Sequence, residues 1–298
     1  MTRIRLGHSL MLAVLLGGCS TVRAPNLGAP VAEACFPFER LAPADRAVAD
    51  SLLAHALDHE ALYTLAAPLK PMSSVGMLTL RIAPPDSLAE QTPPDTFPTE
   101  AALARVAQWH RIAEVFHCGS AEAVLVPYRN VYDGVRYLQL TVVDRSRVHA
   151  LMDATPEVWG YWGVSGEAAP SVIVGAVENA ESYRRFRGYG LLFGYPRYAI
   201  DFFVAAAQEA DRTEQFVTRD FFHVPVHAAE RGYFTYAIPK GHTPSAIDSA
   251  RYHTAMNILS AYRDRRAVYL TPDSTLDALG LLRDWRSQGL PLIQTPSL

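Results

Sequence analysis

The apolar and polar positions of this 298-residue chain form two kinds of pattern, which together predict an α/β architecture. Short apolar stretches bounded by turn residues predict strands over residues 76–82, 123–128, 135–143, 171–177, 221–226 and 233–238. Longer stretches predict helices over residues 43–66, 99–117, 147–153, 244–265 and 271–286, with two more on either side of residues 194–196. We therefore expect a mixed sheet that contains two hairpins and has helices packed on it.

Local turn signals mark the ends of several of these elements. Asp133-Gly134 is a strong signal for a tight hairpin turn, and a second turn is expected at Glu230–Gly232. Gly194 and Pro196 predict a break at which one helix ends and the next begins. The proline-rich stretch 84–98 is short and lies between elements, so it is not a domain boundary. Residues 35–298 are expected to form a single soluble α/β domain.

The first 18 residues have the pattern of a secretory signal. Arg3 and Arg5 precede an apolar run over residues 10–16, and the small residues Gly17 and Gly18 follow. The apolar run is too short to cross a bilayer core of about 30 Å as a permanent helix. Residues 1–18 are therefore expected to be removed after export.

The sequence Leu16-Gly17-Gly18-Cys19 resembles the lipobox of bacterial lipoproteins. The resemblance covers residues 1–20 and implies that Cys19 is acylated and becomes the mature N-terminus. Ser20, directly after this cysteine, implies export to the outer membrane, with the domain facing the periplasm. Residues 19–34 contain Pro25, Gly28 and Pro30 and are expected to form a flexible tether. The membrane is thus the first expected partner.

The composition limits the function classes. The chain is 49% hydrophobic and 19% charged, which favours a sizeable core and excludes a disordered protein. Its formal net charge of −3 lacks the basic footprint of a nucleic-acid-binding protein. No nucleic acid is expected as a partner.

Two further cysteines, Cys35 and Cys118, remain once Cys19 is acylated. An even number of cysteines in an oxidising compartment favours a disulfide between them. Two separate buried thiols are the alternative. Neither residue belongs to a Cys-x-x-C motif, so a zinc ribbon is not expected.

The strongest metal candidate is the pair His55 and His59, which is spaced to share one face of a helix. Ala56 follows the first histidine, where the His-Glu-x-x-His motif of zinc proteases has glutamate. Structural histidines on a partly buried helix face are therefore the leading interpretation. The sequence assigns no cofactor.

The second predicted hairpin carries the strongest catalytic candidates. A turn centred near Glu230 places Lys240 beside Asp220, and His223 and His242 are expected near the same end of the sheet. Such a group contains a general base, a cation and an orienting carboxylate. A polar sheet rim is the alternative.

Two further features suit ligand binding. Trp159, Tyr161 and Trp162 alternate with glycines in an aromatic segment, which suits contact with a sugar, a peptide or a lipid interface. Lys70 is one of only two lysines and lies in a segment with hydroxyl side chains that suits an anion.

These observations favour an envelope lipoprotein whose domain binds a glycan or a peptide, because no complete catalytic motif is present. The alternative is a tethered hydrolase-like enzyme that uses His223, Lys240 and His242, with or without a metal ion.

Overall fold

A computed structural model describes residues 35–287 except for residues 89 and 92. The chain divides into two units, residues 1–33 and 34–298, and the described residues belong to the second. The predicted signal, the lipobox cysteine Cys19 and the tether lie outside the described residues. None of the helices in the described part of the chain combines the length and the hydrophobicity that a membrane span requires.

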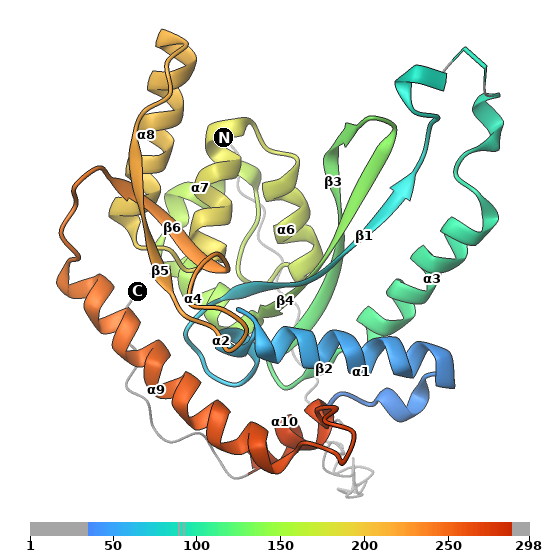
Figure 1. Cartoon of the computed structure of the whole chain (residues 1–298). Helices are drawn as coiled ribbons and strands as arrows, with labels where there is room; N and C mark the ends of the chain where they lie inside the picture. The colour runs from blue at the N-terminus through green and yellow to red at the C-terminus, as the bar shows by residue number, and fades with distance from the viewer. Residues whose placement is uncertain (1–34, 89, 92, 288–298) are drawn as a thin grey trace, which may run out of the picture. The chain divides into compact units, whose positions relative to one another are not determined.

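The main sheet has four antiparallel strands (Figure 1). They are ordered β1 (Met72–Arg81), β4 (Val135–Asp144), β3 (Ala121–Tyr132) and β2 (His117–Cys118). Asp133 and Gly134 both have positive φ and connect β3 to β4, as the sequence predicts. The second predicted hairpin is also present and forms a separate two-stranded sheet. Its strands are β5 (Arg219–Val224) and β6 (Phe234–Pro239).

Ten α-helices are described in residues 35–287. In chain order they are α1 (Pro43–Asp58), α2 (Leu62–Leu65), α3 (Glu100–Val115), α4 (Arg145–Ala154), α5 (Pro156–Trp159), α6 (Pro170–Glu178), α7 (Ser182–Leu192), α8 (Arg197–Thr213), α9 (Ala246–Val268) and α10 (Ala278–Ser287). Four short 3₁₀ helices are η1 (Phe38–Arg40), η2 (Asp86–Leu88), η3 (Pro94–Thr96) and η4 (Gly160–Trp162). The predicted α/β class is confirmed, with all strand pairs antiparallel and the two hairpins in different sheets.

The predicted strand over residues 171–177 is wrong, because this segment is helix α6. Its valine and isoleucine content favours a strand. However, Pro170 occupies the first helical turn, and Ile173, Val174 and Val177 share one buried face at helical spacing. This face packs on β3. Tertiary packing therefore outweighs the residues' preference for strands.

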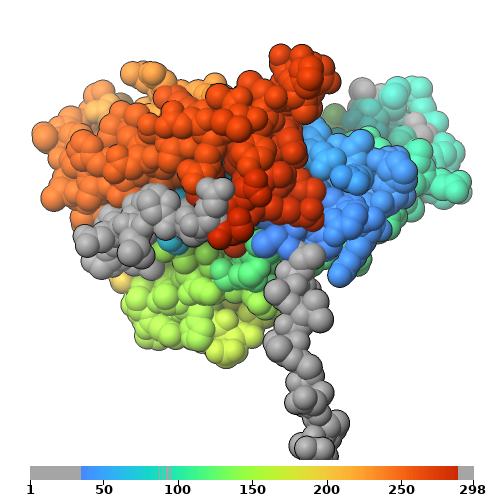
Figure 2. All heavy atoms as spheres, turned by 90° about the horizontal axis from the view of Figure 1, so that it is seen from below, coloured from blue at the N-terminus to red at the C-terminus, as the bar shows by residue number. Residues whose placement is uncertain are grey.

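The core has two parts, which cover opposite faces of the main sheet. One part joins α1, α3, α9 and α10 and includes Leu140, Tyr262 and Trp285. Figure 2 shows the C-terminal helices, coloured orange to red, against the blue α1. The other part joins α4 to α8 and includes Trp159 and Val177. The sheet is therefore covered on both faces, and α6 to α8 bound the cavity described below.

Cys35 and Cys118 lie at disulfide distance, with their Cα atoms 4.4 Å apart, in agreement with the predicted pairing. Cys118 belongs to β2, and its neighbour in the pairing with β3 is Ala121. The pair therefore attaches the first described residue to the edge of the main sheet.

Candidate functional site

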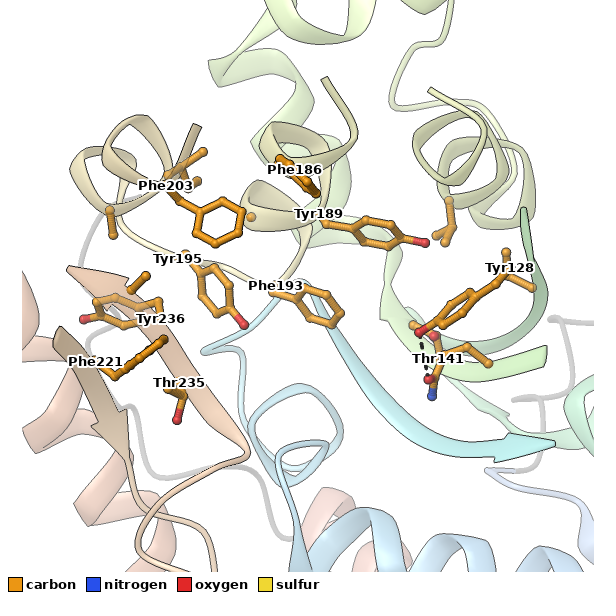
Figure 3. A pocket seen from close by; sticks show the side chains of 17 residues that line it. Tyr128, Thr141, Phe186, Tyr189, Phe193, Tyr195, Phe203, Phe221, Thr235 and Tyr236 are labelled. Carbon is orange, nitrogen blue, oxygen red and sulfur yellow. Dashed lines mark hydrogen bonds between the residues drawn. The ribbon is translucent and has the colours of Figure 1, made fainter. Parts of the chain in front are cut away.

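An aromatic cavity of about 360 Å³ lies between the main sheet, the α7–α8 pair and the β5–β6 hairpin (Figure 3). Strands β3 and β4 form one wall, helices α6, α7 and α8 form the second, and β5 and β6 form the third. The lining residues are Val126, Tyr128, Gln139, Thr141, Val174, Phe186, Tyr189, Gly190, Phe193, Tyr195, Ala199, Ile200, Phe203, Phe221, Thr235, Tyr236 and Ala237. None of these seventeen side chains is charged.

A ladder of stacked rings forms the centre of the cavity wall. The ring centroids of Tyr189 and Phe193 are 5.7 Å apart, and those of Phe193 and Tyr195 are 5.9 Å apart. The helix break predicted from the sequence produces this arrangement. Gly194 has a φ of 72° after α7, and Pro196 caps α8, so Tyr195 projects from the short connection. The hydroxyl of Tyr195 points toward the cavity in Figure 3.

Most polar groups of the wall already have protein partners. The Tyr128 hydroxyl donates to Gln139 Oε1 at 3.2 Å, and the Tyr189 hydroxyl donates to Glu178 Oε2 at 2.6 Å. Burial raises the pKa of Tyr189 and of Tyr195 above the ordinary tyrosine value. The phenols therefore stay neutral at physiological pH, and the cavity presents an uncharged surface.

Lys70 lies behind this wall rather than in it. Its side chain is fully buried and forms an ion pair with Glu60. The Nζ atom is 4.5 Å from the ring centroid of Phe234 and 5.3 Å from that of Phe193, which lines the cavity. Burial lowers the pKa of Lys70 against the opposing effect of Glu60. Lys70 therefore supports the aromatic wall and has no exposed surface on which to bind an anion.

Asp220 and Lys240 come together as the sequence predicts. Lys240 Nζ is 2.6 Å from Asp220 Oδ1, and Gly241 N–H donates to Asp220 Oδ2 at 2.8 Å. The hydrogen bond from Lys240 and the one from Gly241 hold the pKa of Asp220 below its usual range. Both side chains are exposed to solvent to a substantial extent. They form a polar pair at the rim of the hairpin.

The two candidate histidines do not join this pair. His223 is three residues from Asp220 on β5, so its side chain lies on the opposite face of the strand, and its Nδ1 is 2.8 Å from Thr235 Oγ1. His242 stacks on Tyr198 with centroids 5.0 Å apart and lies 3.5 Å from the buried carboxylate of Asp248. The four catalytic candidates therefore occupy three different environments.

His55 and His59 stack on each other, with ring centroids 3.8 Å apart. The His59 Nδ1 atom is 2.7 Å from the backbone oxygen of His55. Burial, and next to it the proximity of His59, lower the pKa of His55. Among the described residues, no group of three or more histidine, cysteine or carboxylate side chains is arranged to hold a metal ion.

The aromatic segment divides between the core and the surface. Trp159 is 1% exposed, and its indole N–H donates to Thr155 Oγ1 at 2.9 Å. Tyr161 is 57% exposed, and Trp162 is half-buried beside a surface groove on the α7–α8 pair. Only Tyr161 and Trp162 are therefore placed to contact a ligand.

Comparisons with protein-family models, with curated proteins and with solved structures find no match for this chain.

The cavity residues were not predicted from the sequence, because they come from seven separate helices and strands. One local signal was present: Phe186, Tyr189 and Phe193 are spaced three and four apart, which places three aromatic rings on one face of α7 and the turn that ends it. Such a stripe marks a buried or ligand-contacting face. It does not show which other elements complete the site.

Proposed function

We propose that this protein is a binding protein whose aromatic cavity takes a small, mainly apolar ligand or the apolar group of a larger one. The observation that carries the proposal is a cavity of about 360 Å³ with seventeen uncharged lining residues, most of them aromatic or aliphatic. Its size lies in the range of small-molecule sites, which are mostly apolar with a few orienting polar groups.

The character of the wall favours an apolar group over a sugar in this cavity. A charged ligand would lose its hydration without meeting an opposite charge among the lining side chains. A sugar ring would need several free hydrogen-bonding partners, whereas the Tyr128 and Tyr189 hydroxyls already bind Gln139 and Glu178. The cavity can instead hold an aromatic ring, a short acyl chain or an apolar peptide side chain. Such a group has no charge to dehydrate and needs no hydrogen-bonding partner.

A hydrolase-like function receives less support from the geometry. It requires His223, Lys240 and His242 around one reacting group, and these side chains lie in separate environments. His223 does lie near the cavity, because its partner Thr235 is a lining residue. A histidine at the cavity rim suits orientation of a ligand as well as chemistry.

The proposal includes attachment to the envelope through Cys19. The lipobox-like sequence at residues 16–19 supports acylation, and several acyl chains give stable attachment where one chain does not. Ser20 supports location at the outer membrane. The binding domain would then act close to the membrane surface.

Titration of the purified full chain with the neutral fluorophore N-phenyl-1-naphthylamine tests the binding proposal. We expect saturable binding with a blue-shifted emission. Ala237→Phe places a ring in the cavity and should weaken binding at least tenfold, about 1.4 kcal/mol. Phe221→Ala, which removes a partly exposed lining ring, should also weaken it.

Phe216→Ala is the matched control, because Phe216 is a more exposed phenylalanine outside the cavity. Circular dichroism melting of each variant verifies the fold. The proposal is wrong if the fluorophore does not bind saturably, or if folded Ala237→Phe binds it as tightly as the native chain does.

A further inference from the structure

A second site lies on another face of the same helix pair, in a groove of about 450 Å³ bounded by α5, η4, α7 and α8. We propose that this groove binds a saccharide that stacks on Trp162. Its lining residues are Glu157, Val158, Trp162, Tyr183, Arg184, Arg187, Arg197, Asp201, Val204 and Gln208. Unlike the cavity, it combines an aromatic ring with several charged side chains.

The helix geometry separates the two sites. On α8 the cavity is lined by Ala199, Ile200 and Phe203, whereas the groove is lined by residues 197, 201, 204 and 208. At about 100° per residue, these two sets point roughly 120° apart around the helix axis. The groove is therefore a separate site, and this inference does not depend on a ligand in the cavity.

Trp162 is held rigidly at the edge of the groove. Its ring centroid is 5.6 Å from that of the buried Trp159. Its Cη2 edge packs against α7 at Gly188, where an added Cβ atom would lie 3.2 Å away. The ring is half-buried and borders the groove. A fixed aromatic face is suited to the C–H groups of a sugar ring, because both surfaces are apolar and neither has to be ordered on binding.

Two ion pairs supply the polar part of the groove. Arg197 Nη2 is 3.0 Å from Glu157 Oε1 and joins α8 to α5. The guanidinium of Arg187 pairs with Asp201 and joins α7 to α8. In the two pairs the side chains are between 31% and 56% exposed, so a donor and an acceptor lie next to each other at the surface.

A third guanidinium adds further donors. Arg184 lies over the ring of Tyr161, with its Cζ atom 3.5 Å from the ring centroid. The Glu181 carboxylate is 4.0 Å from its Nε atom, at the limit of an ion pair. The contact with Tyr161 holds the guanidinium beside the groove, so its N–H groups are available to a ligand there.

These side chains fit hydroxyl groups better than anions or apolar groups. A hydroxyl donates to a carboxylate and accepts from a guanidinium at the same time, so adjacent hydroxyls of a sugar match an exposed ion pair. A phosphate meets the arginines but is repelled by Glu157 and Asp201. A purely apolar ligand leaves five charged side chains partly desolvated. The combination with Trp162 therefore points to a neutral saccharide.

Saturation-transfer NMR of the full chain with chitobiose, cellobiose and maltose tests this inference, and tryptophan fluorescence titration gives the affinities. We expect at least one disaccharide to bind through its ring protons. Trp162→Leu and Glu157→Gln should each weaken this binding at least tenfold. Glu157→Gln serves as the second variant because Glu157 is an exposed side chain, whereas Trp162 also packs against Trp159.

Glu209→Gln is the matched control, because Glu209 forms an exposed ion pair with Arg212 on the same helix but outside the groove. It should leave disaccharide binding unchanged, and so should Ala237→Phe in the aromatic cavity. The inference is overturned if none of the three disaccharides binds, or if folded Glu157→Gln binds as the native chain does. It is also overturned if poly-glutamate, a probe for an acidic peptide, binds to the groove and the disaccharides do not. A failure of N-phenyl-1-naphthylamine binding would affect only the cavity proposal.

Discussion

Lys70 and Glu60 form a buried ion pair directly behind the aromatic wall of the cavity. Glu60 also accepts a hydrogen bond from the Ser74 backbone N–H at 3.0 Å, so its carboxylate joins β1 to the segment after α1. The ammonium group meets two aromatic rings on its other side. The Lys70 ammonium group thus helps to position Phe193 and Phe234 through cation–π contacts as well as through packing.

Lys70→Met should reduce the free energy of unfolding by about 3–5 kcal/mol, because it leaves the Glu60 carboxylate buried without its partner. Lys70→Met combined with Glu60→Gln should recover part of this loss, because neither charge then remains. Urea denaturation measures both. The control is Lys240→Met at the other lysine, whose pair with Asp220 is exposed and should hardly affect the midpoint. Equal effects of the two single substitutions would contradict the structural role of Lys70.

The stability of the domain should fall as the pH decreases below about 6.5. Burial lowers the pKa of both His55 and His227 below the ordinary value of 6.5. The folded state therefore binds fewer protons than the unfolded state below this pH, and acidification favours unfolding. His55→Asn and His227→Gln should each make the free energy of unfolding less dependent on pH between 7 and 5.

Thermal melting across this range measures the effect, and His253→Gln on the exposed surface of α9 is the control. A native chain whose stability is constant from pH 7 to pH 5 would refute the expectation.

Cys35 and Cys118 should carry no free thiol in the native, non-reduced protein. Closing a loop with a sequence separation of 83 contributes about 4 kcal/mol through the reduced entropy of the unfolded chain. Cys35→Ser should therefore lower the melting temperature as much as reduction does, and reduction should have no further effect on this variant. Alkylation with iodoacetamide under native conditions counts the thiols. Two modified cysteines in freshly isolated protein would exclude the bond.

Cys19→Ser should prevent acylation, because Cys19 is the cysteine of the lipobox-like sequence. Cells grown with radiolabelled palmitate should label the native chain but not the variant, and the variant should retain its signal segment. The Cys35→Ser variant should be labelled like the native chain. Label on Cys19→Ser would show that another residue carries the lipid.

The elements that depend on local chemistry were predictable from the sequence. Thr99 caps α3 through its side chain, which accepts from the Ala102 N–H at 3.2 Å. Asp133-Gly134 forms the first hairpin turn, and Gly194 ends α7. In each case the residue satisfies a steric or hydrogen-bonding need of its immediate neighbours, so no knowledge of the rest of the fold is required.

The β5–β6 register shows where such reasoning becomes insufficient. A turn centred at Glu230 pairs Asp220 with Lys240, whereas the structure pairs Asp220 with Ile238. The shift is two residues, so every side chain keeps its predicted face and the Asp220–Lys240 contact survives. The expected approach of His223 fails for a different reason: it is an odd number of residues from Asp220 and therefore lies on the other face.

Neither site could be derived from sequence spacing alone. The cavity and the groove lie between elements far apart in the chain, and tertiary packing decides which faces meet. Trp159 and Trp162 illustrate this: they are three residues apart in one aromatic segment, yet one is buried in the core and the other borders the groove. Composition indicates which kinds of ligand contact are available, whereas the packing of α7 and α8 decides which residues line each site.

The covalent link between Cys35 and Cys118 also has a mechanical consequence. If the proposed anchor at Cys19 holds the chain, tension on it enters the described domain at Cys35, its first residue. From there the load passes through the sulfur atoms to Cys118 in β2. The pairing of Cys118 with Ala121 then transmits it to β3. Because the bond closes residues 36–117 into a loop, tension applied at Cys35 cannot draw this segment, which contains α1 and β1, out to its full length.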